Sequence, residues 1–99
     1  MPFYAVQYTY TDDAQALEAG RPAHRDYIRS FVEPGLLRAS GPYPGADPDS
    51  ALLIFKADSE KIVQDIIEND PFTRDHLIAR HSIHEWRPLI GVFADELDD

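Results

Sequence analysis

The chain of 99 residues contains no cysteine, so neither a disulfide framework nor a thiolate nucleophile is available to it. Its start lacks the basic segment and apolar segment of a secretion signal. No apolar run approaches the roughly 20 residues that a membrane-spanning helix needs. We therefore expect a cytoplasmic protein that does not insert into membranes.

Basic residues are also scarce, because nine Lys and Arg stand against 18 Asp and Glu, for a net charge of −9. Lys and Arg supply the phosphate contacts that dominate nucleic-acid affinity, and they also bind anionic membrane surfaces. We therefore expect neither partner. The composition, 43% hydrophobic, is that of a globular protein, and the length suits one domain over residues 1–99. The acidic end, residues 94–99, is expected to be frayed.

The sequence lacks a glycine-rich phosphate loop, a dinucleotide-binding fingerprint and the elbow motif of a nucleophilic serine. Three histidines, His76, His81 and His84, invite a metal interpretation. However, the odd separation of His81 and His84 puts them on opposite faces of a strand, and no carboxylate has the spacing of a known ligand set. We therefore expect no metal and no cofactor.

The hydrophobic pattern alternates between strand and helix signals. Aromatic and β-branched residues predict strands over residues 3–10, 36–43, 51–57 and 82–89. Apolar residues at helical spacing predict helices over residues 21–33 and from Ser59, the expected N-cap, to about residue 68. Residues 14–20, which end at Gly20, are expected to form a loop or one loose turn. A short helix is expected from Pro71 to about Ile78.

The loop over residues 44–49 is too short for a crossover, so the second and third strands form an antiparallel hairpin. Right-handed crossovers then favour a ferredoxin-like βαββαβ arrangement, an α+β fold with two helices on one face of a four-stranded antiparallel sheet. The first and third strands are apolar on both faces, and the second face has no expected cover. Such a face usually marks an interface, so we expect a homodimer with its open sheet faces packed together, a dimeric α+β barrel.

The stretch Asp70-Pro71-Phe72 lies where the second long helix ends. Proline disfavours helical geometry at Asp70, which is a good N-cap for a helix beginning at Pro71. In the predicted topology the start of the first helix lies beside this point, so His24 and Asp70 come together. A carboxylate beside a histidine fixes its tautomer, which is the minimum apparatus for moving a proton near neutral pH. The same pair also fits a structural role, a buried histidine bonded to a capping carboxylate.

The same end of the sheet receives the end of the first strand and the end of the second. We expect two catalytic residues, His24 and Asp70, and six residues in the wall of a small-molecule pocket: Tyr8, Arg21, Ser40, Gly41, Pro42 and Phe72. Ser40 would supply a hydrogen bond. Arg21 is either a solvated side chain or an anchor for an anionic substrate.

Three segments resemble the signatures of the YCII-related (YciI-like) family: Arg-Pro-Ala-His at residues 21–24, Leu-Leu-Arg-Ala-Ser-Gly-Pro at residues 36–42, and Asp-Pro-Phe at residues 70–72. The resemblance covers nearly the whole chain. The chain departs from the family in the last strand, where a frequent Pro-Phe ending is replaced by Trp-Arg-Pro-Leu at residues 86–89. The resemblance implies a dimeric ferredoxin-like fold in which His24 and Asp70 are a candidate active-site pair. Some members are linked to elimination chemistry on chlorinated aromatic breakdown products, and many have no established reaction.

Three functional hypotheses remain open. The leading one is a small enzyme of lyase or isomerase type that uses His24 and Asp70 for proton transfer on a small aromatic or carboxylated molecule. The alternative is a non-catalytic ligand-binding or accessory dimer with the same pocket. A third, which rests on fold analogy alone, is cofactor-free monooxygenase or muconolactone-isomerase-like chemistry.

Overall fold

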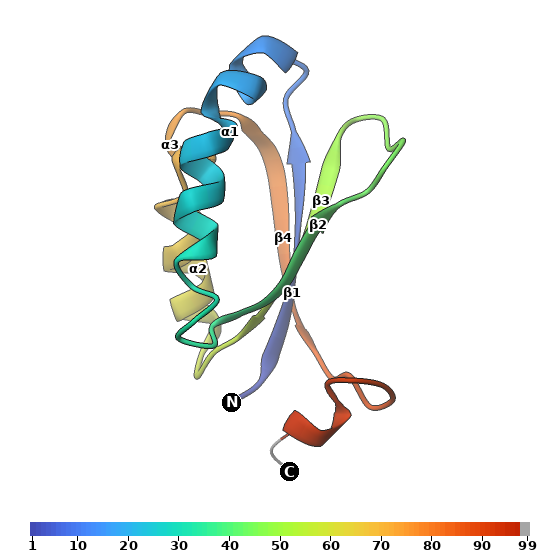
Figure 1. Cartoon of the computed structure of the whole chain (residues 1–99). Helices are drawn as coiled ribbons and strands as arrows, with labels where there is room; N and C mark the ends of the chain where they lie inside the picture. The colour runs from blue at the N-terminus through green and yellow to red at the C-terminus, as the bar shows by residue number, and fades with distance from the viewer. Residues whose placement is uncertain (98–99) are drawn as a thin grey trace.

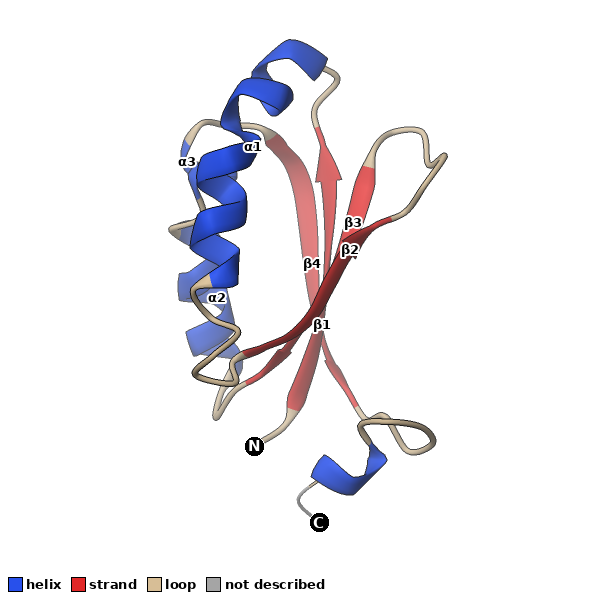
Figure 2. Ribbon diagram, viewed as in Figure 1, coloured by secondary structure: helices blue, strands red, loops and turns tan. Residues whose placement is uncertain are grey.

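The structure, a computed structural model, describes residues 1–97. Within that range the elements follow in the order β1 (Phe3–Tyr10), α1 (Ala14–Arg29), β2 (Leu37–Pro42), β3 (Ser50–Lys56), α2 (Glu60–Glu68), α3 (Pro71–Arg74), β4 (Ile78–Trp86) and the 3-10 helix η1 (Ala94–Glu96). The strands form one antiparallel sheet with the order β2-β3-β1-β4. Helices α1, α2 and α3 lie on one side of it (Figures 1 and 2). The predicted ferredoxin-like α+β fold is thereby confirmed.

The main core lies between the sheet and the helices. Its largest contributions come from buried side chains on two strands and one helix: Tyr4, Val6 and Tyr8 of β1, Leu53 and Phe55 of β3, and Val63, Ile66 and Ile67 of α2. The register pairs Tyr4 with Phe55, so the alternation of each strand turns one set of side chains toward the helices. Burial of each large side chain contributes about 1.5–3 kcal/mol. This packing holds α2 over the sheet, and the buried Ile28 of α1 belongs to the same core and holds that helix there.

Helix α1 begins at Ala14, so the predicted loop over residues 14–20 was wrong. Asp13 caps the helix, because its Oδ1 accepts a hydrogen bond from the backbone N–H of Ala16 at 3.1 Å. The alanines and Leu17 that follow are strong helix formers, and Leu17 is buried. Pro22 therefore lies inside the helix, where its ring removes a backbone hydrogen bond. The first turns of α1 lean away from the axis of the rest (Figure 1), as a proline kink requires.

The last elements also differ from their predicted bounds. Ser59 caps α2 as predicted, but α3 ends at Arg74 and not near residue 78. His76 has a positive φ of 60°, a conformation that no helix contains, so the chain turns there. Strand β4 then begins at Ile78, which pairs with Tyr10 of β1, and it ends before Pro88, which cannot donate to a ladder.

The opposite face of the sheet is partly covered by the C-terminal segment of the same chain. Phe93 packs against Phe3 with ring centroids 5.5 Å apart, and the Glu96 carboxylate bonds to Arg38 at 2.6 Å. The expectation that nothing in the chain covers this face was therefore wrong at this end. Residues 94–99 were expected to be frayed. Residues 94–97 lie against the sheet instead, and residues 98–99 lie outside the described range.

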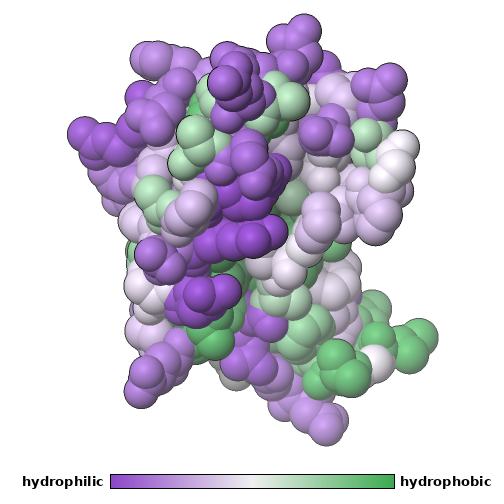
Figure 3. All heavy atoms as spheres, turned by 45° about the horizontal axis from the view of Figure 1, so that its top comes forward, coloured by the Kyte–Doolittle hydropathy of each residue, from purple (hydrophilic) through white to green (hydrophobic). Residues whose placement is uncertain are grey.

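The loop between β4 and η1 leaves three apolar side chains exposed, Leu89, Ile90 and Val92. Figure 3 shows apolar atoms projecting at the lower right, the side on which the C-terminal segment projects in Figure 1. None of the helices within residues 1–97 has the length and apolar character needed to cross a membrane. The homodimer stays a prediction.

Candidate active site

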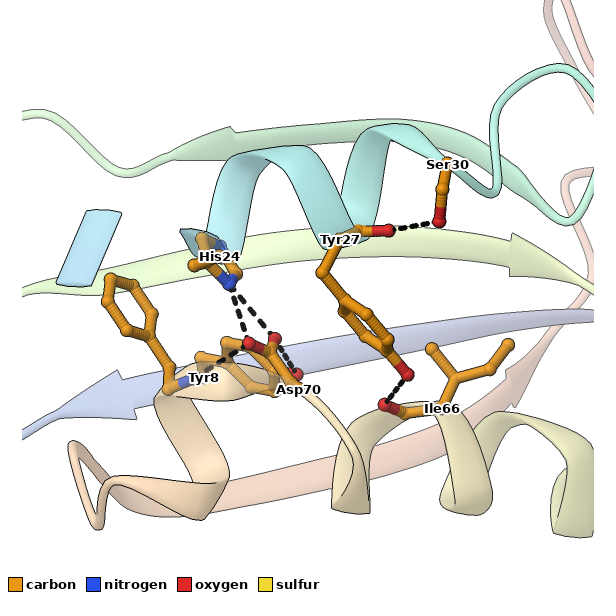
Figure 4. A network of polar contacts seen from close by, with 7 residues as sticks. Tyr8, His24, Tyr27, Ser30, Ile66 and Asp70 are labelled. Atoms are coloured by element: carbon orange, nitrogen blue, oxygen red, sulfur yellow. Dashed lines mark hydrogen bonds and ion pairs between the residues drawn. The ribbon is translucent and has the colours of Figure 1, made fainter. Parts of the chain in front are cut away.

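The centre of the candidate site is a hydrogen-bonded pair from two helices. His24 projects from α1, and Asp70 is the N-cap of α3. Nδ1 of His24 lies 2.8 Å from Oδ1 and 3.0 Å from Oδ2 of Asp70 (Figure 4). The Asp70 side chain is 0% exposed and that of His24 is 12% exposed. A carboxylate so fully removed from water must find its hydrogen-bond donors within the protein.

Asp70 finds three donors. Besides Nδ1 of His24, the backbone N–H of Phe72 donates to Oδ1 at 2.9 Å, and the Tyr8 hydroxyl donates to Oδ2 at 2.9 Å. The first of these additional bonds is the cap of α3, so one carboxylate both caps a helix and holds the histidine. The capping bond and the bond to His24 therefore coexist on one carboxylate. A catalytic role for Asp70 stays a prediction.

Tyr8 does not lie where the sequence analysis placed it. It was expected in the pocket wall, but it is fully buried behind Asp70. Burial, and secondly the Asp70 carboxylate, raise the pKa of the Tyr8 hydroxyl, so it stays a protonated donor at neutral pH. Tyr10, two residues further along the strand, lines the cavity instead. Burial and the same carboxylate raise the pKa of Tyr10 to about 12, so it too is a neutral phenol.

Phe72 fixes the plane of the histidine ring. The two rings stack, with centroids 4.2 Å apart and planes inclined by only 9°. Gly20 of α1 leaves room for the Phe72 ring, because a Cβ at that position would lie 3.2 Å from its Cε1, closer than an ordinary contact. Sequence reasoning took Gly20 as the end of a loop and missed this role. Its position four residues before His24, on the same side of a helix, was the available signal.

A cavity of about 590 Å³ opens between α1 and β2, a size that suits a small molecule. His24 lines it, and because Nδ1 is bonded to Asp70, Nε2 is the ring nitrogen left for a ligand. Five of the six predicted wall residues line the cavity: Arg21, Ser40, Gly41, Pro42 and Phe72. Their roles toward a substrate, and the catalytic roles of His24 and Asp70, stay predictions.

Two arginines that sequence reasoning missed, Arg25 and Arg29, also line the cavity. They follow Arg21 at intervals of four residues, so all three lie on one side of α1. The spacing was visible in the sequence. It was not recognised because the predicted helix began at residue 21, which made Arg21 a helix terminus rather than the first member of a row.

Within residues 1–97, no three His, Cys, Asp or Glu side chains are grouped as a metal site would need. In the sheet His81 pairs with Tyr8 and His84 pairs with Ala5. The two histidines therefore lie on opposite faces, as the alternation of a strand requires. That the protein works without a metal or cofactor stays a prediction.

Similar folds occur among solved structures. The 5-chloro-2-hydroxyhydroquinone dehydrochlorinase TftG from Burkholderia phenoliruptrix, solved as a complex with 2,5-dihydroxybenzoquinone, matches with a TM-score of 0.75 and 25% identity, over 85% of this chain and 92% of that one. An antibiotic biosynthesis monooxygenase matches with a TM-score of 0.53 and 13% identity, over 85% and 94% of the two chains. Rv0793 from Mycobacterium tuberculosis matches with a TM-score of 0.54 and 16% identity, over 92% of this chain and 98% of that one. The last two show a likeness of fold alone.

No curated protein sequence matches the chain. The family model of the YCII-related domain, in contrast, matches residues 1–87. This range contains the paired His24 and Asp70 and every residue that lines the cavity. The chain therefore belongs to the YCII-related domain family.

Proposed function

We propose that the protein is a small-molecule enzyme of the lyase type, in which His24 and Asp70 together move a proton. One observation carries the proposal. A fully buried carboxylate bonds Nδ1 of a histidine whose ring lines a cavity of about 590 Å³. With Asp70 accepting from Nδ1–H, the neutral ring has its lone pair on Nε2, on the side left for a ligand.

The geometry supports a base-promoted elimination. Nε2 of His24 accepts a proton from a substrate hydroxyl or an acidic carbon. The electron pair left behind forms a new double bond, and a leaving group in conjugation departs with its bonding pair. The proton on Nε2 then passes to the leaving group or to water. The substrate thus loses one molecule of HX, and no oxidant or reductant is consumed.

Asp70 serves this step by stabilising the imidazolium that forms when Nε2 is protonated. Its carboxylate lies 2.8 Å from Nδ1 and is shielded from water, where an ion pair is stronger than at a surface. The stacked Phe72 ring and the Nδ1 contact hold the imidazole in one orientation, so Nε2 needs no rearrangement before it accepts the proton.

The comparison with TftG supports the reaction class. That protein is named a dehydrochlorinase and was solved with a dihydroxybenzoquinone, and it shares 25% identity with this chain. A dehydrochlorinase removes HCl, which is the elimination described above with chloride as the leaving group. Among the three hypotheses, we therefore place lyase chemistry on a hydroxylated ring first and a non-catalytic binding dimer second.

The test is halide release from 5-chloro-2-hydroxyhydroquinone and related halogenated hydroxyquinols. We expect the wild type to release halide, and His24→Gln to lose about 100-fold or more of kcat, the usual contribution of a general base. His81→Gln is the matched control, because it removes an exposed imidazole that does not line the cavity. If the wild type binds these compounds and releases no halide, the protein is a binder of such rings and the enzymatic proposal fails.

A second measurement addresses the pair without any substrate. The ¹⁵N shifts of the His24 ring report its tautomer, and the wild type is expected to show a proton on Nδ1. Asp70→Asn keeps the capping ability, since Asn caps nearly as well as Asp, but it removes the negative charge. We expect this variant to fold and, because an amide oxygen accepts more weakly than a carboxylate, to hold the Nδ1–H tautomer less completely than the wild type. An unchanged tautomer would mean that the charge of Asp70 does not set the tautomer of the ring.

A further inference from the structure

The cavity is lined by positive charge in a chain that is strongly acidic. The chain has nine basic residues against 18 acidic ones, yet three of the nine, Arg21, Arg25 and Arg29, line the cavity along α1. Among the residues within 1–97 that line it, none is Asp or Glu. Asp70, which lies behind His24, is shielded from the cavity by its full burial. Of the side chains that the structure describes, an anion that enters therefore meets cations and no acidic group.

The spacing of the three arginines works against the helix that carries them. Residues 21, 25 and 29 are four apart, so successive members lie about 6 Å from each other along one side of α1. Like charges at this spacing repel each other and destabilise a helix. A structural explanation would need carboxylates that offset the repulsion.

Such carboxylates are present for only one of the three. Arg21 bonds to Glu18, which is one turn earlier on α1. Within residues 1–97, neither Arg25 nor Arg29 has an ion-pair or hydrogen-bond partner on its side chain, although Asp26 lies beside Arg25 in sequence. The guanidinium of Arg38, whose residue also lines the cavity, bonds to Glu96 and is occupied. Arg25 and Arg29 are exposed, so their charges at the cavity are solvated by water and not paired with any described carboxylate.

The rest of the wall divides the cavity into two sides. With 3.6 residues per turn, Ile28 lies between His24 on one side of the helix and the arginines on the other. Leu37 of β2 adds apolar surface opposite. A ligand would thus have an apolar body against Ile28 and Leu37, one end at the histidine and the other at the arginines.

We infer that the cavity takes a carboxylated ligand whose carboxylate is bound by Arg25 and Arg29, with its ring or hydrocarbon body placing the reacting atom at Nε2 of His24. The position of the reacting atom rests on the proposed function. The binding of the carboxylate does not, because it depends only on the arginines. Guanidinium groups suit this task, since they present paired N–H donors to the two oxygens of a carboxylate.

The test compares two probes that differ in one charge, 2,5-dihydroxybenzoate and its uncharged counterpart 2,5-dihydroxybenzamide. Calorimetry on the wild type should show the acid binding at least tenfold more tightly than the amide, with an advantage that shrinks as salt is raised. The double variant Arg25→Gln/Arg29→Gln should lose that advantage while its affinity for the amide stays within about twofold. Circular dichroism checks that the variant is folded, as expected when a repulsive pair of charges is removed.

The control is Lys61→Gln, which removes one positive charge, where the double variant removes two, and does so on the exposed side of α2. It should leave the preference for the acid intact. Three results would overturn the inference. The wild type could bind acid and amide equally, or fail to bind the acid at concentrations on the order of 10 mM. The double variant could also keep the preference for the acid unchanged. Loss of the preference in Lys61→Gln would also overturn it, because the effect would then come from net charge.

The two proposals fail in distinguishable ways. If the acid binds through Arg25 and Arg29 but no halogenated hydroxyquinol is turned over, the carboxylate site stands and the enzymatic proposal fails. If halide release depends on His24 while a carboxylate brings no advantage in binding, the enzymatic proposal stands and the carboxylate site is wrong.

Discussion

At two places in the molecule a carboxylate connects separate elements of the fold, and these two carboxylates differ in how completely they are shielded from water. Behind the cavity, Asp70 is 0% exposed and accepts from an imidazole, a phenol and a backbone N–H. On the other face of the sheet, the Glu96 side chain is 28% exposed and contacts Arg38 and Lys56 at 2.6 and 3.5 Å. A buried carboxylate must keep every donor, whereas an exposed one exchanges its donors for water at little cost.

The two carboxylates also differ in how many elements they hold in place. The donors around Asp70 come from β1, α1 and the start of α3, so this one group fixes the relative positions of three elements and the orientation of the histidine. Glu96 fixes only the C-terminal segment against the sheet, together with the contact of Phe93 with Phe3. The orientation of His24 therefore depends on all three contacts of Asp70. The contacts of Glu96 position only the C-terminal segment.

The largest effect is expected for Asp70→Ala. The substitution removes the cap of α3 and leaves the buried Tyr8 hydroxyl and the partly buried His24 ring without their acceptor. A lost cap costs about 1 kcal/mol and each buried donor left unpaired about 1–3 kcal/mol, so the sum is a large fraction of the stability of a small domain. Urea unfolding followed by circular dichroism measures the change. Asp70→Asn is the control, because it keeps the cap and should lose clearly less. Equal losses in the two variants would show that the charge of Asp70 dominates and the cap contributes little.

The pairing of His24 with Asp70 was predictable because its signals are local. The proline at residue 71 marks the end of α2, and the antiparallel packing of the two helices brings His24 beside that end. The predicted reason was partly wrong, because His24 lies in the second half of α1 and not at its start. The depth of each side chain was not predictable in this way. Alternation assigns Tyr8 and Tyr10 to the same face of β1, but only the packing of α3 decides that Tyr8 is sealed and Tyr10 reaches the cavity.

Two other errors have the same origin, which is a contact between residues far apart in sequence. Gly20 inside α1 is explained by Phe72 of α3, and without that neighbour a glycine reads as the end of a helix. The cover on the second face depends on Phe93 reaching Phe3 at the other end of the chain. No pattern within either segment indicates the other.

Tyr8→Phe should have the next largest effect. It removes one of the three donors to Asp70 and leaves a buried carboxylate oxygen short of a partner, at a cost of about 1–3 kcal/mol. Because Tyr8 does not line the cavity, binding of 2,5-dihydroxybenzamide should change little. Urea unfolding and calorimetry measure the two quantities separately. Tyr10→Phe is the control and should show the reverse pattern, with a small change in stability and a larger one in binding, since Tyr10 lines the cavity. A large loss of binding in Tyr8→Phe alone would restore its predicted place in the wall.

Gly20→Ala should change the site more than the stability. Alanine in a helix interior is favoured over glycine by up to about 1 kcal/mol, but its Cβ would lie 3.2 Å from Cε1 of Phe72 and displace that ring. The two effects oppose each other, so the free energy of unfolding should change by less than about 1 kcal/mol. The shift that the ring current of Phe72 causes in the NMR signals of the His24 protons should decrease.

Ala19→Gly, at an exposed position one residue earlier, is the control and should destabilise the protein without moving the His24 signals. Unmoved His24 signals in Gly20→Ala would mean that the stack does not need the glycine.

For a monomer, Glu96→Gln should have the smallest effect of all, so a larger effect bears on the homodimer. In a monomer the ion pairs of Glu96 are partly exposed, and such pairs contribute about 0–1 kcal/mol. If two open sheet faces pack together as predicted, the same carboxylate lies near an interface and loses more of its water. The loss of stability in Glu96→Gln should then exceed that range and depend on protein concentration, because folding and association are linked.

Sedimentation of the wild type at micromolar concentration gives the oligomeric state directly, and Lys61→Gln on the helix side is the control for loss of an exposed ion pair. A stable monomer, with a small and concentration-independent effect of Glu96→Gln, would leave the apolar loop around Ile90 facing water and refute the dimer.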